Sequence, residues 1–190
     1  MDREYKLAVV CASNQNRSME AHNTLRNHGY TCSSYGTGSA VRLPGPTRQQ
    51  PNVYKFGVPY NVMYNDLYRK DVRLYTQNGI LNMLDRNRKI KLAPERFQDN
   101  QDQFEIVITC EERVFDAALE DILNKATVFK KPVHVINVEI IDNHEHALIG
   151  GQLILQLIYQ SSDLDHEMDT LLEEFRQKTQ ASILYSYAVM

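Results

Sequence analysis

Short, almost wholly apolar runs alternate along this chain with longer segments in which apolar residues recur every three or four positions. The short runs are rich in β-branched residues, which is typical of strands buried in a parallel sheet. They predict strands over residues 6–10, 31–35, 104–109 and 133–138, with a terminal strand over 183–189.

The longer segments have the spacing of amphipathic helices. They predict helices over residues 18–28, 60–74, 79–86, 111–125, 147–159 and 163–178, and Gly29 is typical of a helix end. Because strands alternate with helices, the predicted fold class is α/β, with a central, mainly parallel sheet between two layers of helices. The pattern contains no internal repeat and no linker, so residues 1–190 are predicted to form a single domain.

Residues 36–59 interrupt the alternation with the sequence GTGSAVRLPGPTRQQPNVYKFGVP. Glycine and proline are frequent in it, and we expect loop throughout. Loops of this length in compact domains usually have a function or are mobile.

Composition and charge exclude some classes of protein. With 43% hydrophobic and 24% charged residues the chain is an ordinary globular protein. A net charge of −3 gives no electrostatic case for binding nucleic acid or a membrane surface. We find neither a signal peptide nor an apolar run of membrane-spanning length. One basic cluster is typical of a solvated face: Arg86, Arg88, Lys89, Lys91 and Arg96.

The three cysteines, Cys11, Cys32 and Cys110, are far apart in the sequence. A disulfide framework or a zinc ribbon is therefore not expected. The pattern fits a reducing compartment, either cytosol or nucleus, in which a catalytic thiolate survives. The six histidines form no recognisable ligand set, so we expect neither a metal nor another cofactor.

The segment 11–17 carries the most chemistry. Cys11 ends the first predicted strand, Arg17 and Ser18 open the first predicted helix, and five small or polar residues lie between: Ala12, Ser13, Asn14, Gln15 and Asn16. Backbone N–H groups of such a loop, at a helix N-terminus, can gather around a phosphate. Asparagine suits this loop because it tolerates positive φ better than most residues.

Each polar side chain in the segment has a predicted part. A helix N-terminus and nearby cations favour the thiolate form of a cysteine, which is its nucleophilic form. Arg17 would hold two phosphate oxygens with its planar fork. Ser18 would donate its hydroxyl to the sulfur of Cys11. The alternative is a structural cysteine at the end of a core strand. The strand, loop and helix context favours the phosphate-binding interpretation.

A phosphatase for serine substrates also needs an acid, because the departing alkoxide is strongly basic. The strand at 133–138 leads to the same sheet edge and is followed by Glu139, Asp142 and Glu145. We prefer Asp142, since the preceding apolar pair, Ile140 and Ile141, could partly desolvate it and keep it protonated. Asp142 with the following asparagine has the alternative role of an N-cap for the next helix.

Several longer motifs share one resemblance. They are VCASNQNRSMEAH, SSYGTGSAVRLPGP, PNVYKFG, YTQNGILNMLDRN, PERFQ, FEIVITCEERVFD and PVHVINVEIIDNHEHA. Together they resemble the eukaryotic RNA polymerase II C-terminal-domain phosphatases of Ssu type, which belong to the messenger-RNA 3′-end processing machinery. The resemblance covers nearly the whole chain, to about residue 178.

The resemblance implies a fold related to the low-molecular-weight protein tyrosine phosphatases, with additional elements. The implied substrate is the polymerase heptad repeat, phosphorylated on the serine at its fifth position and to some degree its seventh. Cys11 falls on the family nucleophile, Arg17 on the phosphate-binding arginine and Asp142 on the general acid. The reaction would pass through a phosphocysteine intermediate.

The resemblance also implies how the substrate is recognised. The proline after the phosphoserine would bind in cis, against Arg42, Leu43, Pro44 and Met83. From the residues alone, Leu43 could equally anchor its loop to the core, and Met83 is more typical of core packing. A symplekin-like scaffold of the cleavage and polyadenylation complex is the implied partner, in the nucleus and in transcription termination. Cis recognition further predicts functional coupling to a prolyl isomerase.

Two other functions remain as alternatives. A thiol-dependent arsenate reductase uses a similar loop, but needs resolving cysteines, and only Cys32 and Cys110 are available. A non-catalytic scaffold subunit would retain the fold, yet it predicts a damaged loop, whereas Cys11, Arg17 and Asp142 are all present.

Overall fold

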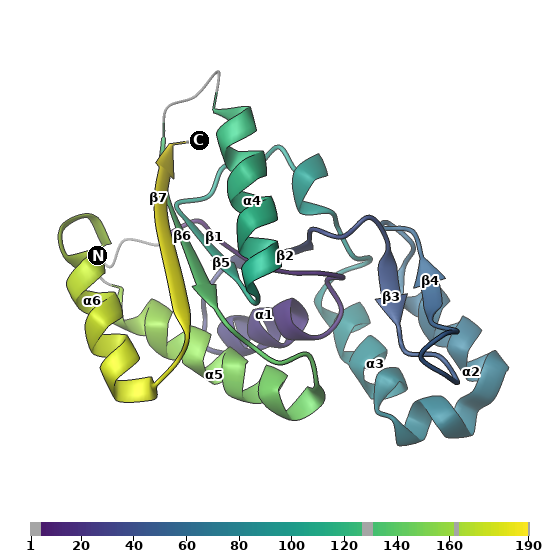
Figure 1. The fold of residues 1–190 in the computed structure, drawn as a ribbon. Coiled ribbons are helices and arrows are strands. Elements are labelled where there is room, and N and C mark those ends of the chain that lie inside the picture. The colour runs from purple at the N-terminus through teal and green to yellow at the C-terminus, as the bar shows by residue number, and fades with distance from the viewer. Residues whose placement is uncertain (1–4, 127–130, 162–163, 190) are drawn as a thin grey trace.

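The computed structural model describes residues 5–126, 131–161 and 164–189. Its centre is a five-stranded sheet in the order β2-β1-β5-β6-β7 (Figure 1). The strands are β1 (Leu7–Cys11), β2 (Cys32–Gly36), β5 (Ile106–Thr109), β6 (Pro132–Val138) and β7 (Ile183–Val189). The first four run parallel, and β7 pairs antiparallel with β6. The predicted α/β class with a mainly parallel sheet is confirmed.

Helices cover both faces of this sheet. One face packs against α1 (Arg17–Asn27), α5 (His144–Gln160) and α6 (Leu164–Thr179), and the other against α4 (Glu112–Lys125). The predicted start of the last helix, Asp163, lies outside the described residues. Helix α5 begins three residues before the predicted 147, because Asn143 caps it: the Asn143 side chain accepts the backbone N–H of His146 at 2.8 Å.

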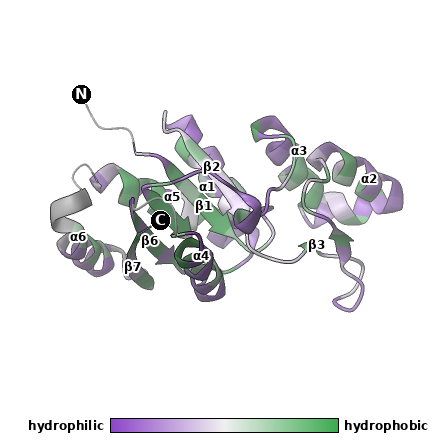
Figure 2. Cartoon of the chain, turned by 90° about the horizontal axis from the view of Figure 1, so that it is seen from above, coloured by the Kyte–Doolittle hydropathy of each residue, from purple (hydrophilic) through white to green (hydrophobic). Residues whose placement is uncertain are grey.

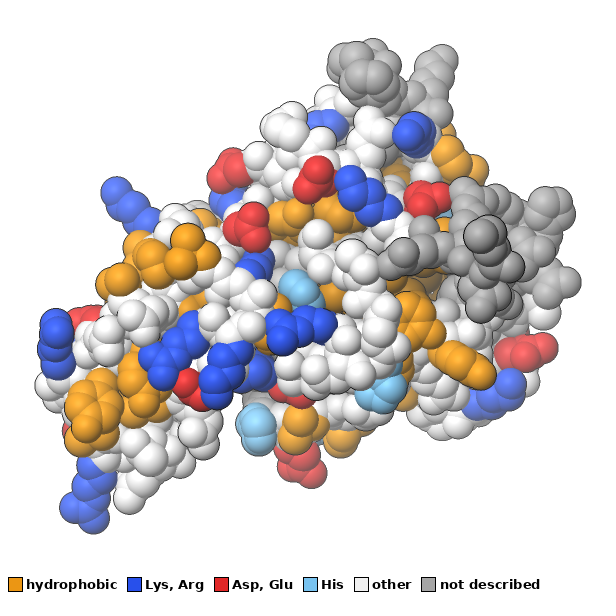
Figure 3. All heavy atoms as spheres, turned by 180° about the vertical axis from the view of Figure 1, so that it is seen from behind, with side chains coloured by type: hydrophobic (Ala, Val, Ile, Leu, Met, Phe, Trp, Pro, Cys, Tyr) orange, Lys and Arg blue, Asp and Glu red, His pale blue; other side chains and the backbone are white. Residues whose placement is uncertain are grey.

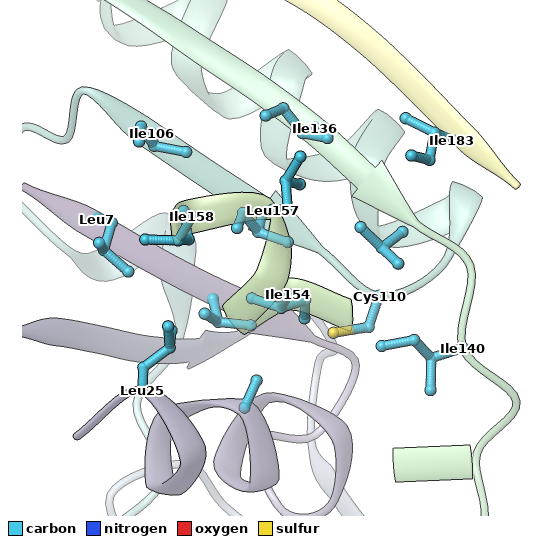
Figure 4. Packing of buried hydrophobic residues seen from close by; sticks show 14 of the residues in the cluster. Leu7, Leu25, Ile106, Cys110, Ile136, Ile140, Ile154, Leu157, Ile158 and Ile183 are labelled. Atoms are coloured by element: carbon cyan, nitrogen blue, oxygen red, sulfur yellow. The ribbon is translucent and has the colours of Figure 1, made fainter. Parts of the chain in front are cut away.

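The apolar runs become the two cores that flank the sheet. Alternate residues of each strand point to opposite faces, so Leu7 and Val9 join the core under α5, while Ala8 and Val10 join the core under α4. Figure 4 shows the first of these cores, with Ile154 and Leu157 of α5 lying against the strands. Both strand faces are therefore apolar, which is why these strands read as continuous runs rather than as alternating ones.

A further unit stands at one side of the sheet, as Figure 2 shows. It consists of the hairpin β3 (Val41–Leu43) and β4 (Asn52–Tyr54) with α2 (Tyr60–Gln77) and α3 (Ile80–Ile90). These elements share a third apolar core, which includes Leu43, Tyr60 and Leu84 and reaches Met19 of α1.

The hairpin corrects the prediction that residues 36–59 are loop throughout. Val41 and Leu43 are buried on one side of β3, and Arg42 between them is exposed, which is the alternation of a half-buried strand. Only three residues on each strand pair, and the surrounding glycine and proline masked so short a pattern. A 3-10 turn, η1 (Phe97–Asp99), completes the elements of the described segments.

The sheet topology selects one edge for a ligand. Strand β1 lies between β2 and β5, so the chain leaves β1 toward one side first and the other side later. In open α/β sheets, ligands bind at the carboxyl ends of strands beside such a point of reversal. Cys11 ends β1 there, as the sequence predicts. Among the described residues no helix has both the length and the apolar character needed to cross a membrane.

Candidate active site

Cys11 lies at the end of β1 with only 3% of its surface exposed. Its Sγ is 3.0 Å from Oγ of Ser18, which is itself fully buried at the start of α1. The hydroxyl of Ser18 can donate to the sulfur and also accepts the side-chain amide of Asn14 at 3.0 Å. The predicted contact between Ser18 and Cys11 is present.

The backbone carbonyls between β1 and α1 are bonded to elements outside the loop. The carbonyl of Cys11 accepts the N–H of Thr37 at 3.0 Å, and that of Ala12 accepts the N–H of Gly38 at 2.9 Å. The carbonyl of Asn14 accepts the hydroxyl of buried Tyr60 at 2.7 Å. Each peptide unit is planar and trans, so the next residue's N–H points the opposite way.

The N–H groups of Ala12, Ser13 and Gln15, which follow these carbonyls, thus face away from the tethers, and among the described residues no backbone partner is found for an N–H of residues 12–17. Asn14 has φ 52, the left-handed conformation expected of an asparagine in this loop. Its side-chain oxygen accepts the N–H of Glu95 at 3.1 Å, which holds the conformation in place. A left-handed residue among right-handed neighbours is the backbone form that concentrates N–H groups on an anion.

Arg17 is buried, with 4% of its side chain exposed, and one side of its guanidinium is already bound. Nη1 donates to Oε2 of Glu111 at 2.7 Å and to the carbonyl of Ile140 at 3.0 Å. Nε lies 3.4 Å from Oδ1 of Asp142 but donates no hydrogen bond within the described residues. The unused donor is on the part of the fork that a phosphate would need.

The charge on Arg17 is strongly favoured. Burial alone lowers its pKa, but the negative charges at Cys11 and Asp142 and the hydrogen bond to Glu111 raise the pKa above its usual value. Arg17 is therefore a permanent cation. Glu111 and Ile140 hold its Nη1, whereas its Nε has no hydrogen-bond partner among the described residues.

The structure gives the three candidate acids, Glu139, Asp142 and Glu145, different surroundings. Glu139 has a structural role, because its Oε2 accepts the N–H of Glu112 at 3.1 Å and the amide of Asn137 at 3.0 Å. Asp142 lines the same cavity as Cys11, whereas Glu145 does not. Oδ1 of Asp142 also accepts the side-chain amide of Asn16 at 3.0 Å.

Two expectations about Asp142 change. The cap of α5 is Asn143, so the N-cap alternative does not apply to Asp142 itself. The expected desolvation by the apolar pair before it is wrong: the Asp142 side chain is 60% exposed. Ile140 turns into the core instead, as Figure 4 shows, and Ile141 is 62% exposed.

One cavity of about 450 Å³ joins most of the predicted site residues. Its walls include Cys11, Ser13, Gln15, Asn16, Arg17, Arg42, Leu43, Pro44, Met83 and Asp142. Ala12, Asn14 and Ser18 are not among the lining residues, because they support the loop from behind. Leu43 belongs to the third core, as expected if it anchors its loop, and it also lines the cavity, so that its contact with a substrate proline stays a prediction. Met83 likewise packs against that core and lines the cavity.

Sequence reasoning missed several residues that hold the loop. Glu111 binds Arg17, Tyr60 binds the Asn14 carbonyl, and Arg86 with Asn87 bind the Gln15 carbonyl. A signal existed for Asn87: it lies three residues after buried Leu84, a polar residue on an apolar helix face. No local pattern marked the others, whose partners are far away in the sequence.

The basic cluster is only partly a solvated face. Arg88 and Lys89 are exposed, and Figure 3 shows Lys and Arg side chains gathered on the rear surface. The prediction is wrong for Arg86 and Lys91, whose side chains are 16% and 15% exposed. Both turn inward because buried carbonyls accept their hydrogen bonds: Gln15 for Arg86 and Ser34 for Lys91.

The other two cysteines are poorly suited to resolve an oxidised Cys11. Cys110 is fully buried, and burial raises its pKa well above the usual value. Burial also raises the pKa of Cys32 to about 12. A resolving cysteine must act as a thiolate, so these environments disfavour the arsenate reductase alternative.

The close approach of β2 to the loop gives a testable prediction. A Cβ on Gly36 would lie 2.7 Å from the carbonyl oxygen of Ala12 and 3.0 Å from the backbone N of Asn14. Because neither backbone atom can rotate away, we expect Gly36→Ala to lower the free energy of unfolding by about 1–3 kcal/mol. The substitution should also impair anion binding by the loop. Urea unfolding and inorganic phosphate binding measure the two effects.

Gly29→Ala is the matched control for Gly36→Ala. Gly29 has φ +84 with nothing within 4 Å of its added Cβ, so the variant carries backbone strain but does not touch the loop. It should lose about 1 kcal/mol of stability and bind phosphate normally. Equal phosphate binding by the two variants would contradict the role assigned to Gly36.

Known proteins resemble this chain over nearly its whole length. The model of the Ssu72-like protein family matches residues 5–190. The SSU72 phosphatase of the RNA polymerase II C-terminal domain from Danio rerio is 56% identical over 184 residues, 95% of each chain. The Homo sapiens protein of that name is 53% identical with the same coverage. One similar crystal structure is that of D. melanogaster Ssu72 with Symplekin, bound to a cis peptidomimetic phosphoserine peptide of the C-terminal domain. Its TM-score is 0.95 at 46% sequence identity, and the match covers 98% of this chain and 99% of that chain.

Proposed function

The chain belongs to the Ssu72-like protein family, and from this premise we propose that it is a cysteine-based phosphatase of the RNA polymerase II C-terminal domain. It removes phosphate from phosphoserine at the fifth heptad position, and to some degree at the seventh. The observation that carries the proposal is the loop 11–17, where Sγ of Cys11 lies 3.0 Å from Oγ of Ser18, the loop N–H groups lack backbone partners among the described residues, and Cys11 and Arg17 line one cavity.

The first chemical step transfers the phosphoryl group to sulfur. The Cys11 thiolate attacks phosphorus and forms the S–P bond as the bond from phosphorus to the serine oxygen breaks. The loop N–H groups and Arg17 stabilise the charge on the remaining phosphate oxygens. Protonated Asp142 gives its proton to the departing serine oxygen, so that a neutral hydroxyl leaves.

The second step restores the enzyme. A water molecule attacks phosphorus, the Asp142 carboxylate accepts its proton, and the S–P bond breaks to release inorganic phosphate. The leaving group is the Cys11 thiolate, which the Ser18 hydroxyl stabilises from 3.0 Å. The charge of the transition state is thus balanced by groups of this chain.

Nε of Arg17 can pair either with Asp142 or with a bound phosphate. Oδ1 of Asp142 lies 3.4 Å from Nε of Arg17 and accepts the side-chain amide of Asn16. A bound phosphate would take Nε as its own donor and leave Asp142 facing the leaving oxygen. The contact with Glu111 holds the guanidinium in place throughout.

The apolar end of the cavity supports recognition of a proline. Leu43 and Pro44 line one wall and Met83 another, and the backbone N–H of Arg42 contacts Oγ of Ser13 in the loop at 3.3 Å. The hairpin and α3 therefore place apolar side chains beside the phosphate site. The D. melanogaster relative bound to a cis peptidomimetic supports a cis proline after the phosphoserine.

The proposed setting follows from the same relatives. The complex of the D. melanogaster relative with Symplekin supports a symplekin-like scaffold as the partner of this chain. Action on the polymerase tail implies a nuclear site of action, in messenger-RNA 3′-end processing and transcription termination. Functional coupling to a prolyl isomerase follows from cis recognition, because unfolded X–Pro bonds are cis only about 10–30% of the time.

The test uses the wild-type protein and heptad phosphopeptides with chelator present. We expect phosphate release from a phosphoserine–proline peptide to survive chelation, and a peptide locked in trans to be inert. Binding only the cis fraction weakens apparent affinity about 3- to 10-fold. A prolyl isomerase should therefore accelerate turnover once free cis peptide is depleted. Cleavage of the trans-locked peptide at a rate comparable to the cis-locked one would refute cis selectivity.

A further inference from the structure

Arg86 reaches the back of loop 11–17 from α3, although it lies about 70 residues later in the sequence. Its Nη2 donates to the carbonyl of Gln15 at 2.9 Å and approaches that of Asn16 at 3.5 Å. Its Nη1 pairs with the carboxylate of Glu20 on α1. The guanidinium thus ties α3 to both the loop and the first turn of α1.

Asn87 also donates to the Gln15 carbonyl, which therefore accepts two hydrogen bonds. Its buried Nδ2 donates to the carbonyl of Gln15 at 2.9 Å, and its Oδ1 accepts Nε of Arg86 at 3.0 Å. Two donors fix the direction of the Gln15 carbonyl. Because the peptide is planar, they also fix the N–H of Asn16, which points the opposite way, toward the phosphate site.

Arg86 brings charge as well as geometry. It lines the cavity that contains Cys11, with 16% of its side chain exposed, and its charge interacts with that of Cys11. Burial lowers the pKa of Arg86 and the charge of Glu20 opposes the change, but a guanidinium stays charged under all physiological conditions. A second, largely buried cation therefore lies beside the loop and is paired with Glu20.

We propose that Arg86 is a positioning residue that fixes the Gln15 carbonyl and adds positive charge beside the phosphate-binding loop, while Glu20 limits how much of that charge acts on Cys11. This inference rests on the proposed function. It concerns how the loop is held and charged, and it makes no use of the identity of the phosphopeptide.

Several charged groups act on Cys11, and the test must separate Arg86 from them. The cations are Arg17 and Arg86, with Lys91 from the segment after α3, and the anions are Glu20, Glu111 and Asp142. Tyr60, Cys110 and His144 are further titratable groups nearby. Substitution of Arg86 and Glu20 changes one charge each, in opposite senses, and leaves the others in place.

The experiment measures alkylation of Cys11 by iodoacetamide against pH, with no substrate present. We expect Arg86→Met to move the midpoint to higher pH, because the thiolate loses a nearby cation. Glu20→Gln should move it to lower pH, because the charge of Arg86 is then less neutralised. Arg88→Met, a cation two positions along α3 that pairs with Asp85 at the surface, is the control and should leave the midpoint unchanged.

A damaged fold cannot shift the midpoint in two directions, so opposite shifts support the proposal. An unchanged midpoint in Arg86→Met, or shifts of the same sign in both variants, would overturn it. Arg86→Lys separates charge from geometry: it should restore the midpoint but still bind inorganic phosphate about tenfold more weakly than wild type. Normal phosphate binding by Arg86→Met would also overturn the proposal.

A failure of the proposal for Arg86 can be distinguished from a failure of the proposed phosphatase function. Alkylation and phosphate binding do not depend on which phosphopeptide is cleaved, so a wrong substrate leaves both readouts intact. On the phosphopeptide itself, Arg86→Met should lower kcat/KM about 10- to 100-fold, as expected when the reacting groups are misplaced.

Discussion

Replacing Cys11 with serine should abolish phosphate release from both a phosphoserine peptide and an aryl phosphate, by at least about 10⁴-fold in kcat. A serine hydroxyl is far less acidic than a thiol, and the group within 3.0 Å of the nucleophile is another hydroxyl, Ser18, rather than a base. The variant therefore has no means of generating an alkoxide. Steady-state kinetics on both substrates, with phosphate release as the readout, measure the loss.

The variant must keep its fold and its anion site for this loss to be meaningful. The loop carbonyls are held by Thr37, Gly38 and Tyr60, whereas the hydrogen-bond contact of the sulfur is with Ser18. Cys11→Ser should therefore bind inorganic phosphate, unlike a variant whose loop is broken. Residual turnover above about one percent, in a preparation free of wild-type enzyme, would mean that the nucleophile is another group.

Replacing Asp142 with asparagine should lower kcat/KM for the phosphoserine peptide about 100- to 1000-fold, but that for an aryl phosphate less than about tenfold. A serine alkoxide leaves poorly unless it is protonated, whereas a phenolate with a low pKa needs little help. Asparagine keeps the size and the hydrogen-bonding reach of Asp142 toward Asn16. The ratio of the two losses therefore isolates proton donation from positioning.

Glu145→Gln is the matched control for Asp142→Asn. Glu145 lies three residues later, in the first turn of α5, and does not line the cavity. Its variant should retain wild-type rates on both substrates. Equal losses on the two substrates in Asp142→Asn would show that Asp142 positions its neighbours, Arg17 and Asn16, and does not donate a proton.

Local patterns predicted most of the fold. The buried strands and the amphipathic helices follow from apolar spacing within single segments, and their ends shifted by only a few residues. The β3–β4 hairpin could not be predicted this way. Its strands have three residues each, and their burial comes from packing against α2 and α3 rather than from their own sequence.

The candidate site likewise has a part that could be predicted from local sequence patterns and a part that could not. The grouping of Cys11, Arg17 and Ser18 could be predicted because they are neighbours in the sequence, and the structure brings their side chains to one end of β1. Glu111, Tyr60 and Arg86 could not be inferred, since each reaches the loop from 40 or more residues away. The desolvation expected of Asp142 failed for a related reason, because the direction in which Ile140 points depends on the core under α5.

The unit of β3, β4, α2 and α3 has its own apolar core, and it supplies one wall of the cavity, while the sheet supplies the nucleophile. Under the proposed function, the side chains beside the peptide and the reacting sulfur therefore belong to different units, and Tyr60 of α2 and Arg86 of α3 connect the two by holding loop 11–17. A substitution in the hairpin that leaves Tyr60, Arg86 and Asn87 in place should therefore change which peptides are accepted, whereas a substitution of any of those three residues should also disturb the reactive sulfur.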